Sequence, residues 1–295
     1  MSPLRQPTPY DIARLFFVGA VWGGSFIFIA LALKGFGPIS IAAWRIATAA
    51  AVLVVAGVLM KQSFSASPGE WSIISAVGLL NSAVPFFLIN WGQQFISSAE
   101  AALLLATATF VALLISHFTS QDERITWARG IGVTVGFSGV AVLVLSELIS
   151  TGIGGFKGQL AVILAGCSYA TSSVLARRIT HLPSISTSAS TMITASAYMV
   201  PLAFLFEQPL SAIDQWVPVM SVVYLGVIGT ALAFVIRFNI IRTNGAVFMA
   251  QVGYLVPFFG VIWSWLFLAE AISWQTAVSL KLILIGIAIT RRARH

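Results

Sequence analysis

Long, uninterrupted apolar runs dominate this sequence, and each run is about 20 residues long. A helix of that length crosses the hydrocarbon core of a bilayer, whereas a transmembrane β-strand needs only about 10 residues of alternating polarity. Within lipid, every backbone polar group must find its hydrogen bond inside the protein, so spanning segments are helices or closed barrels. Because the runs are continuous, they favour helices. We therefore predict an all-α integral membrane protein.

The scarcity of charge supports a membrane setting. Only 8% of the 295 residues are charged and 58% are hydrophobic, with a mean hydropathy of +0.96. Soluble domains carry about 25% charged residues. The formal net charge of +7 does not predict a nucleic-acid partner, because the basic residues are scattered between the apolar runs. The densest group, Arg291, Arg292 and Arg294, follows the last run, a placement that predicts contact with membrane phospholipid.

The runs predict ten transmembrane helices joined by short loops rich in glycine and proline. Arg5 and Arg14 precede the first run as in a cleaved signal peptide, but this run is long enough to span. We place the spans at 11–33, 39–60, 70–91, 99–118, 127–146, 157–178, 185–206, 215–237, 245–268 and 274–291.

The loop cations predict how the chain is oriented. With a cytoplasmic amino terminus, one side of the membrane holds only Lys34 and Lys157, and the other side collects the rest of the loop cations. This is the positive-inside pattern. We therefore expect a plasma-membrane (inner-membrane) protein with both termini in the cytoplasm.

An internal repeat divides the chain into residues 1–147 and 148–295. Adding 147 to a position in the first half often reaches a matching residue in the second. Because each half contains five predicted spans, an odd number, the second half must be inverted relative to the first. Inverted repeats recur in secondary transporters, with the substrate site near the midplane. The matches include Gly19 with Gly166, Trp22 with Tyr169, Ser25 with Ser172 and Phe87 with Phe234.

Several motifs resemble those of the drug/metabolite transporter superfamily, ten-helix EamA type. They are 22–25 (Trp-Gly-Gly-Ser), 44–45 (Trp-Arg) and the Glu-x-Ile-(Thr/Ser)-Trp segments at 123–127 and 270–274. The resemblance covers essentially the whole chain and implies a transporter of ten helices. Within the superfamily the chain is most similar to YddG-type exporters of aromatic and other amino acids. The small four-helix relatives carry a glutamate in helix 1, and the uncharged 22–26 segment does not predict their proton exchange.

No pattern in the sequence predicts an enzyme. The acids fall in loops or at helix ends, and the three histidines form neither a metal pair nor a catalytic group. Phosphate-binding loops and hydrolase motifs are lacking, and the lone Cys167 excludes an internal disulfide. We expect no catalytic residue, no metal and no cofactor.

Polar and aromatic residues near the middle of the spans are the candidate substrate-binding residues. For each one, an interhelical hydrogen bond is the alternative role. Asn81 and Asn90 are nine residues apart, so at most one faces a cavity unless Pro85 reorients the helix. Lys281 pairs with a substrate carboxylate or else snorkels, and for Arg45 we favour snorkelling. The candidates are Trp22, Asn81, Phe86, Asn90, Thr107, Tyr169, Gln251, Tyr254 and Lys281.

These patterns together predict a monomeric transporter whose spans 1, 3, 4, 6, 8 and 9 line a central cavity, with spans 5 and 10 at the periphery. We expect export of small neutral or zwitterionic metabolites, amino acids among them, by facilitated or weakly coupled transport. The alternatives are a transporter of anionic or phosphorylated metabolites, a drug exporter and a channel. A multi-span membrane enzyme or sensor is the alternative from another class.

Overall fold

The computed structural model describes residues 6–119, 126–150, 153–179 and 182–292, and within these ranges the chain is helical and has no β-strand. The all-α prediction is confirmed for this part of the chain. The helices are α1 (Pro9–Ala32), α2 (Pro38–Leu59), α3 (Pro68–Gly78), η1 (Leu79–Ala83), α4 (Val84–Gly92), α5 (Ser98–Leu105), α6 (Thr107–Thr119), α7 (Trp127–Ser150), α8 (Ile153–Ala176), α9 (Ser184–Phe206), α10 (Trp216–Gly226), η2 (Val227–Leu232), α11 (Ala233–Asn244), α12 (Ala246–Met249), α13 (Val252–Leu268) and α14 (Trp274–Arg292).

Eight helical segments of the described chain are long and apolar enough to cross a membrane, and two shorter apolar helices follow them. Each predicted span coincides with one of these segments. The largest departure is the eighth span, which continues beyond residue 237 to Asn244. The ninth is broken at Ala250 and Gln251, between α12 and α13. Of the cations counted in the loops, Arg5, Arg124 and Arg294 lie outside the described residues.

The helix starts follow signals in the sequence. Thr8, Ser67 and Ser97 each accept a hydrogen bond from the backbone amide three residues later, and the acidic side chain at that position bonds back to the cap. These reciprocal pairs are capping boxes, which satisfy amides that a helix start leaves free. Proline occupies the first turn of α1, α2 and α3, where its missing N–H is not needed.

Helices α2 and α9 are capped by each other's trailing residues. Glu207, directly after α9, accepts hydrogen bonds from the backbone amides of Ile39 at 3.0 Å and Ser40 at 2.8 Å, at the start of α2. At the opposite end of this antiparallel pair, the side-chain carbonyl oxygen of Gln62 accepts a hydrogen bond from the backbone amide of Ser186 at 3.3 Å. One end of the pair is therefore capped by a carboxylate and the other by a neutral amide.

The third and eighth spans each contain a π-helical segment, η1 and η2. Pro85, just after η1, has no N–H to offer the carbonyl of Asn81 four residues earlier, so the regular hydrogen-bond ladder cannot continue there. Shifting η1 by the repeat offset of 147 gives 226–230, which overlaps η2. Such π-segments within α-helices are frequent at functional sites.

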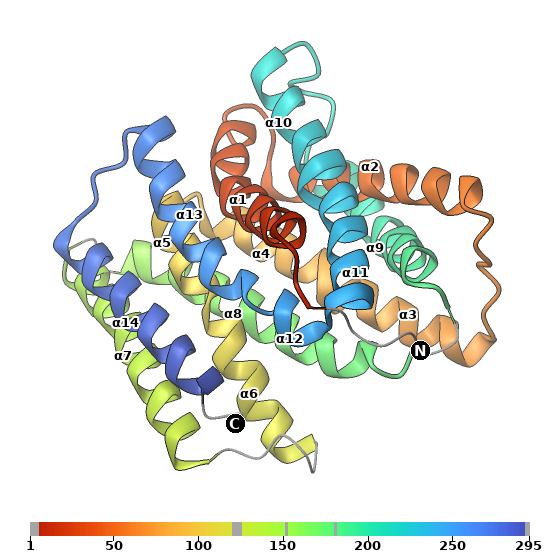
Figure 1. Cartoon of the computed structure of the whole chain (residues 1–295). Coiled ribbons are helices and arrows are strands. Elements are labelled where there is room, and N and C mark those ends of the chain that lie inside the picture. The colour runs from red at the N-terminus through yellow and green to blue at the C-terminus, as the bar shows by residue number, and fades with distance from the viewer. Residues whose placement is uncertain (1–5, 120–125, 151–152, 180–181, 293–295) are drawn as a thin grey trace.

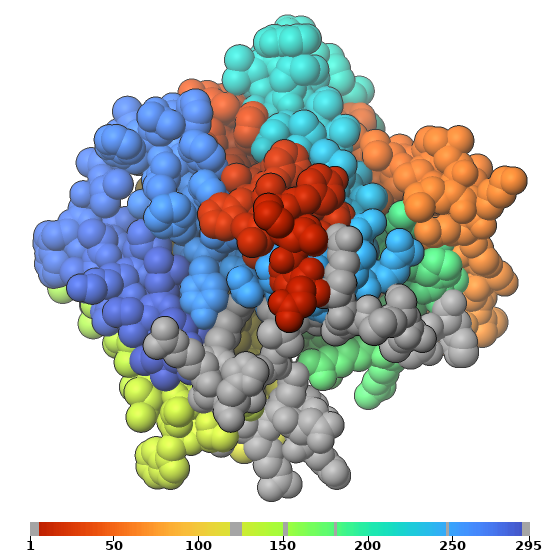
Figure 2. All heavy atoms as spheres, in the orientation of Figure 1, coloured from red at the N-terminus to blue at the C-terminus, as the bar shows by residue number. Residues whose placement is uncertain are grey.

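The helices form two peripheral pairs around a central group (Figure 1). Helix α7 packs along α14 at one edge, and α2 packs along α9 at another. Between them, α1 packs against α13 and α10, while α8 packs against α6 and α4. In the space-filling view of the same face, the start of α1 (red) lies near the centre, between the blue carboxyl-terminal helices and the cyan α10 and α11 (Figure 2). Spans 5 and 10 are peripheral, as predicted.

Glycines allow α7 and α14 to approach closely. A Cβ placed on Gly286 would lie 2.5 Å from the amide nitrogen of Gly136 and 2.6 Å from the carbonyl oxygen of Gly132. A Cβ on Gly139 would lie 3.0 Å from the carbonyl oxygen of Ser279. The two backbones therefore pack directly against each other at these glycines.

Candidate functional site

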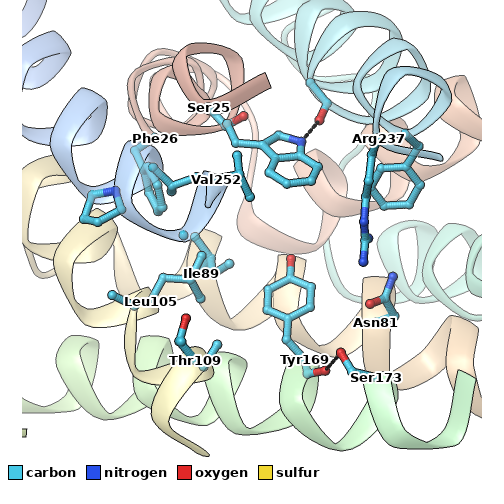
Figure 3. A pocket seen from close by; sticks show the side chains of 18 of the residues that line it. Ser25, Phe26, Asn81, Ile89, Leu105, Thr109, Tyr169, Ser173, Arg237 and Val252 are labelled. Carbon is cyan, nitrogen blue, oxygen red and sulfur yellow. Dashed lines mark hydrogen bonds between the residues drawn. The ribbon is translucent and has the colours of Figure 1, made fainter. Parts of the chain in front are cut away.

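A cavity of about 400 Å³ lies among the central helices (Figure 3). Its wall is formed by α1, η1, α4, α5, α6, α8, η2, α11, α12 and α13, with Arg45 as the contribution of α2. These elements belong to spans 1, 3, 4, 6, 8 and 9, so the predicted set of lining spans is confirmed, and span 2 is added to it. The volume falls within the range of small-molecule sites, about 300–1,000 Å³.

Four predicted site residues line this cavity: Trp22, Asn81, Phe86 and Tyr169. The indole nitrogen of Trp22 donates a hydrogen bond to the carbonyl of Gly229 in η2, at 3.1 Å. The Asn81 carbonyl, in η1, accepts one from the Ser172 hydroxyl at 3.1 Å. Each π-segment therefore offers an oxygen to a side chain of α1 or α8, and this bond holds the wall in place.

Two predicted residues are buried in helix contacts away from the cavity. The Asn90 amide donates to the carbonyl of Pro38 at 3.0 Å, which joins α4 to the start of α2. The hydroxyl of Thr107 donates to the carbonyl of Leu104 at 2.7 Å, at the break between α5 and α6. Both side chains are fully buried; Asn90 has the alternative role of an interhelical hydrogen bond, whereas Thr107 bonds within its own span.

The structure does not bring the remaining three predicted residues to the cavity wall either. Gln251 is exposed at the break between α12 and α13. Tyr254, one turn into α13, is half-buried and packs against the central apolar core. Lys281 is exposed on α14. Helix α14 packs along α7 at the edge of the molecule, and none of its described residues lines the cavity.

Arg45 is the residue whose placement differs most from the interpretation of the sequence. Its side chain is 6% exposed and turned inward, whereas we expected it to snorkel. Its Nε donates to the hydroxyl of Thr230 in η2 at 3.0 Å, and its guanidinium carbon lies 3.8 Å from the centroid of the Phe86 ring. A hydrogen-bond acceptor and an aromatic face, both inside the bundle, explain why the side chain does not reach for the membrane surface.

Arg237 was missed because the eighth span was ended at that position. The span continues to Asn244, so Arg237 lies two turns inside it and lines the cavity. Its guanidinium carbon lies 5.9 Å from the Phe234 ring centroid and 5.7 Å from that of Phe238. Gly245 was the available signal: it ends α11 with φ of 92°, a conformation that glycine adopts readily and that commonly terminates helices.

The wall combines two cations with neutral groups. Arg45 and Arg237 line it, and none of the lining residues is an aspartate or glutamate. Hydroxyl and amide groups, including those of Ser25, Asn81 and Tyr169, complete the polar part. Most other lining side chains are apolar. The site can therefore hold a solute that is partly apolar and partly anionic, and the described part of its wall offers no carboxylate to accept a proton or bind a cation.

Comparison with known proteins agrees with this architecture. The EamA-like transporter family matches twice, over residues 12–145 and 156–292. The chain is 22% identical to the uncharacterized transporter YoaV of Bacillus subtilis, over 92% of each chain. It is 26% identical to an uncharacterized transporter of Archaeoglobus fulgidus, over 92% of this chain and 95% of the relative. It is 22% identical to the inner membrane transporter YedA of Escherichia coli, over 97% of this chain and 90% of the relative.

A solved crystal structure shares the fold. The TM-score is 0.67 over 95% of this chain and 96% of the other, at 21% sequence identity. The family match covers most of both halves of the chain, and the helices are those of a membrane protein. The chain therefore belongs to the EamA-like transporter family and is a multi-pass membrane transporter.

Proposed function

We propose that the chain exports small neutral or zwitterionic metabolites, amino acids among them, through the central cavity. The observation that carries this proposal is the character of the wall, which is largely apolar and aromatic with a few hydroxyl, amide and guanidinium groups. A lining of this kind binds solutes that combine an apolar part with a small polar part. Amino acids with apolar or aromatic side chains have this form.

We further propose that the chain crosses the membrane ten times as two inverted five-helix units, 1–147 and 148–295. Three observations support this. The family matches each half separately. The contacts of α1 with α13, α10 and α11 correspond to those of α8 with α6, α3 and α4. The π-segments η1 and η2 lie at equivalent positions of the two halves. Rocking of such units around a fixed site gives alternating access.

The proposed placement is in the plasma membrane, as a monomer with both termini in the cytoplasm. Cysteine labelling tests the orientation. In a Cys167→Ser background, Lys61→Cys should resist a membrane-impermeant maleimide added to intact cells, whereas Lys34→Cys should react; both lysines are exposed. The reverse labelling would overturn the orientation. Labelling of both or of neither, when a permeant maleimide shows both cysteines to be reactive, would overturn the ten-span topology.

Transport itself is tested with the purified protein in liposomes. We expect saturable uptake of a labelled apolar amino acid that unlabelled apolar amino acids compete with. Because the described wall contains no acid, uptake should proceed without a pH gradient. Strict dependence on that gradient would refute facilitated transport. The absence of uptake and counterflow for every amino acid tested would refute the proposed substrate class.

One observation favours a second candidate function, the transport of anionic metabolites. Arg45 and Arg237 both line the cavity, and neither pairs with a carboxylate in the part of the chain that the structure describes. Phosphorylated metabolites would need polar groups for the remainder of the molecule, and most of the wall is apolar. Competition by sugar phosphates against a labelled amino acid separates the two candidates.

A further inference from the structure

We propose that Arg45 and Arg237 bind the carboxylate of the transported solute and that the cavity has no subsite for an ammonium group. This inference rests on the proposed function, because it concerns the same cavity. It narrows the substrate class to amphipathic carboxylates, in which the amino group of an amino acid is dispensable. A 2-oxo acid with an apolar side chain should then bind at least as well as the amino acid of the same skeleton.

Arg45 presents free donors to the cavity. Its Nε is occupied by Thr230. Its two terminal nitrogens make no hydrogen bond to any residue that the structure describes. These nitrogens are also not among the side-chain atoms that are both buried and without a hydrogen-bond partner, such as Asn90 Oδ1. Because Arg45 lines the wall, these nitrogens are accessible from the cavity. A guanidinium whose two terminal nitrogens are free is suited to bidentate contact with a carboxylate.

Arg237 supplies the second charge from another helix. In Figure 3 its side chain points toward Asn81, and the hydroxyl of Tyr169 projects into the same space. The Arg237 guanidinium lies near the rings of Phe234 and Phe238, which interact with its positive charge and leave its N–H groups available. Asn81 and Tyr169 can add neutral hydrogen bonds to the same anionic group.

No acidic side chain of the described cavity wall balances the charges of the two arginines. Arginine keeps its positive charge at neutral pH, and a buried charge without a partner is unfavourable. Asp11 and Arg14 pair with each other at the start of α1, and neither residue lines the cavity. An anionic ligand would supply the missing partner. A bound ammonium group would meet two like charges and no carboxylate.

The side of the cavity away from Arg237 is mostly apolar, with the Thr109 hydroxyl as a polar group, and this lining selects the rest of the ligand. Figure 3 shows Phe26, Ile89, Leu105 and Val252 on the side away from Arg237. The cavity is therefore polarised, with the Arg237 guanidinium, the Asn81 amide and the Tyr169 phenol on one side and mostly hydrocarbon on the other. A phosphorylated sugar would place hydroxyl groups against this hydrocarbon. A carboxylate with a branched or aromatic side chain fits both ends.

Competition binding to the purified transporter tests the inference. Labelled phenylalanine and labelled phenylpyruvate are each displaced by phenylalanine, phenylalaninamide and phenylpyruvate. The amide lacks the carboxylate, and phenylpyruvate lacks the ammonium group. We expect phenylpyruvate to bind at least as tightly as phenylalanine, and the amide at least tenfold more weakly. Equal binding of phenylalanine and its amide, or loss of binding on removal of the amino group, would overturn the inference.

Variants of the two arginines test the assignment. Arg45→Gln and Arg237→Gln should each weaken phenylpyruvate binding at least tenfold, and the corresponding lysine variants should restore part of it. Arg242→Gln is the matched control, because Arg242 is exposed on the same helix as Arg237 and does not line this cavity. Unchanged binding by well-folded arginine variants would overturn the assignment. If a variant fails to fold, competition binding of phenylalanine, phenylalaninamide and phenylpyruvate to the unaltered protein still tests the inference.

The outcomes separate this inference from the proposed function. If phenylpyruvate binds and phenylalanine does not, the carboxylate subsite stands and the amino-acid substrate class falls. If phenylalanine and its amide bind equally and are transported, the proposed function stands and the subsite falls. If neither phenylalanine nor phenylpyruvate binds, both are overturned.

Discussion

The Nε of Arg45 donates a hydrogen bond to the hydroxyl of Thr230 at 3.0 Å. This bond joins α2 to the π-segment η2, so a cation of the second span is oriented by the irregular part of the eighth. The Thr230 hydroxyl in turn donates to the carbonyl of Leu225 at 2.9 Å. Thr230 thus orients Arg45 from within the bundle.

We predict that Thr230→Val weakens substrate binding without unfolding the protein. Valine keeps the shape of threonine but removes the oxygen that accepts from Arg45. A lost hydrogen bond of about 1 kcal/mol corresponds to about fivefold weaker binding. The measurement is the KM for uptake in liposomes, with Thr230→Ser as the variant that retains the hydroxyl. A KM for Thr230→Val equal to that of the unaltered protein would show that this bond does not orient Arg45 for binding.

We predict that Trp22→Phe lowers both stability and transport. The substitution leaves the Gly229 carbonyl without its donor, at a cost of about 1–3 kcal/mol, and it removes part of the cavity wall. Trp263→Phe is the matched control. The Trp263 indole donates to the carbonyl of Ala20 at 3.1 Å, and Trp263 does not line the cavity. Thermal unfolding should fall for both variants, but the apparent affinity for substrate should change for Trp22→Phe alone. Equal effects on affinity would contradict this.

We predict that Gly286→Val prevents close packing of α7 on α14. The added side chain would overlap the backbone of Gly136 and Gly132, which cannot move away without separating the two helices. Overpacking of this kind costs about 1–3 kcal/mol or more. The yield of monodisperse protein and its unfolding midpoint should both fall. Gly154→Val is the control, since a Cβ at Gly154 meets nothing within 4 Å. A midpoint for Gly286→Val as high as that of the control would refute the predicted clash.

We predict that Glu207→Ala destabilises the protein more than Gln62→Ala. Glu207 accepts two backbone amides and, at 2.7 Å, the Ser40 hydroxyl at the start of α2, whereas Gln62 accepts from the Ser186 amide and hydroxyl, both at 3.3 Å. A lost cap costs about 0.5–2 kcal/mol, and the positive end of the helix dipole favours a carboxylate over an amide. Unfolding midpoints measure the difference. The reverse order would contradict the proposed role of the charge.

The sequence predicted the helices well, because an apolar run, a cap and a proline are local signals. Thr8, Ser67 and Ser97 start helices within about two residues of the predicted positions. The error at the eighth span came from treating a cation as a boundary. Arg237 looks like the end of a span by charge, whereas Gly245 marks the end by backbone conformation.

The candidate site was only partly predictable, because the direction in which a side chain faces depends on how the helices pack. Asn81 and Asn90 were indistinguishable as residue types, and the helix packing brought Asn81 to the wall and left Asn90 in a helix contact. Lys281 and Arg45 are both intramembrane cations in the sequence. The partners of Arg45, Thr230 and Phe86, are distant along the chain, so no local pattern could show that it turns inward.

The two π-segments also determine which side chains the helices after them, α4 and α11, present to the cavity. Each α-helical residue turns the chain by about 100°. If Val227–Leu232 wound as a regular α-helix with all its residues kept, everything after it would turn by about that angle relative to the first half. Arg237, seven residues before the end of α11, would then face a neighbouring helix and Ile241 would turn with it. The π winding of this short stretch therefore determines whether a positive charge faces the cavity more than a full turn further along the helix.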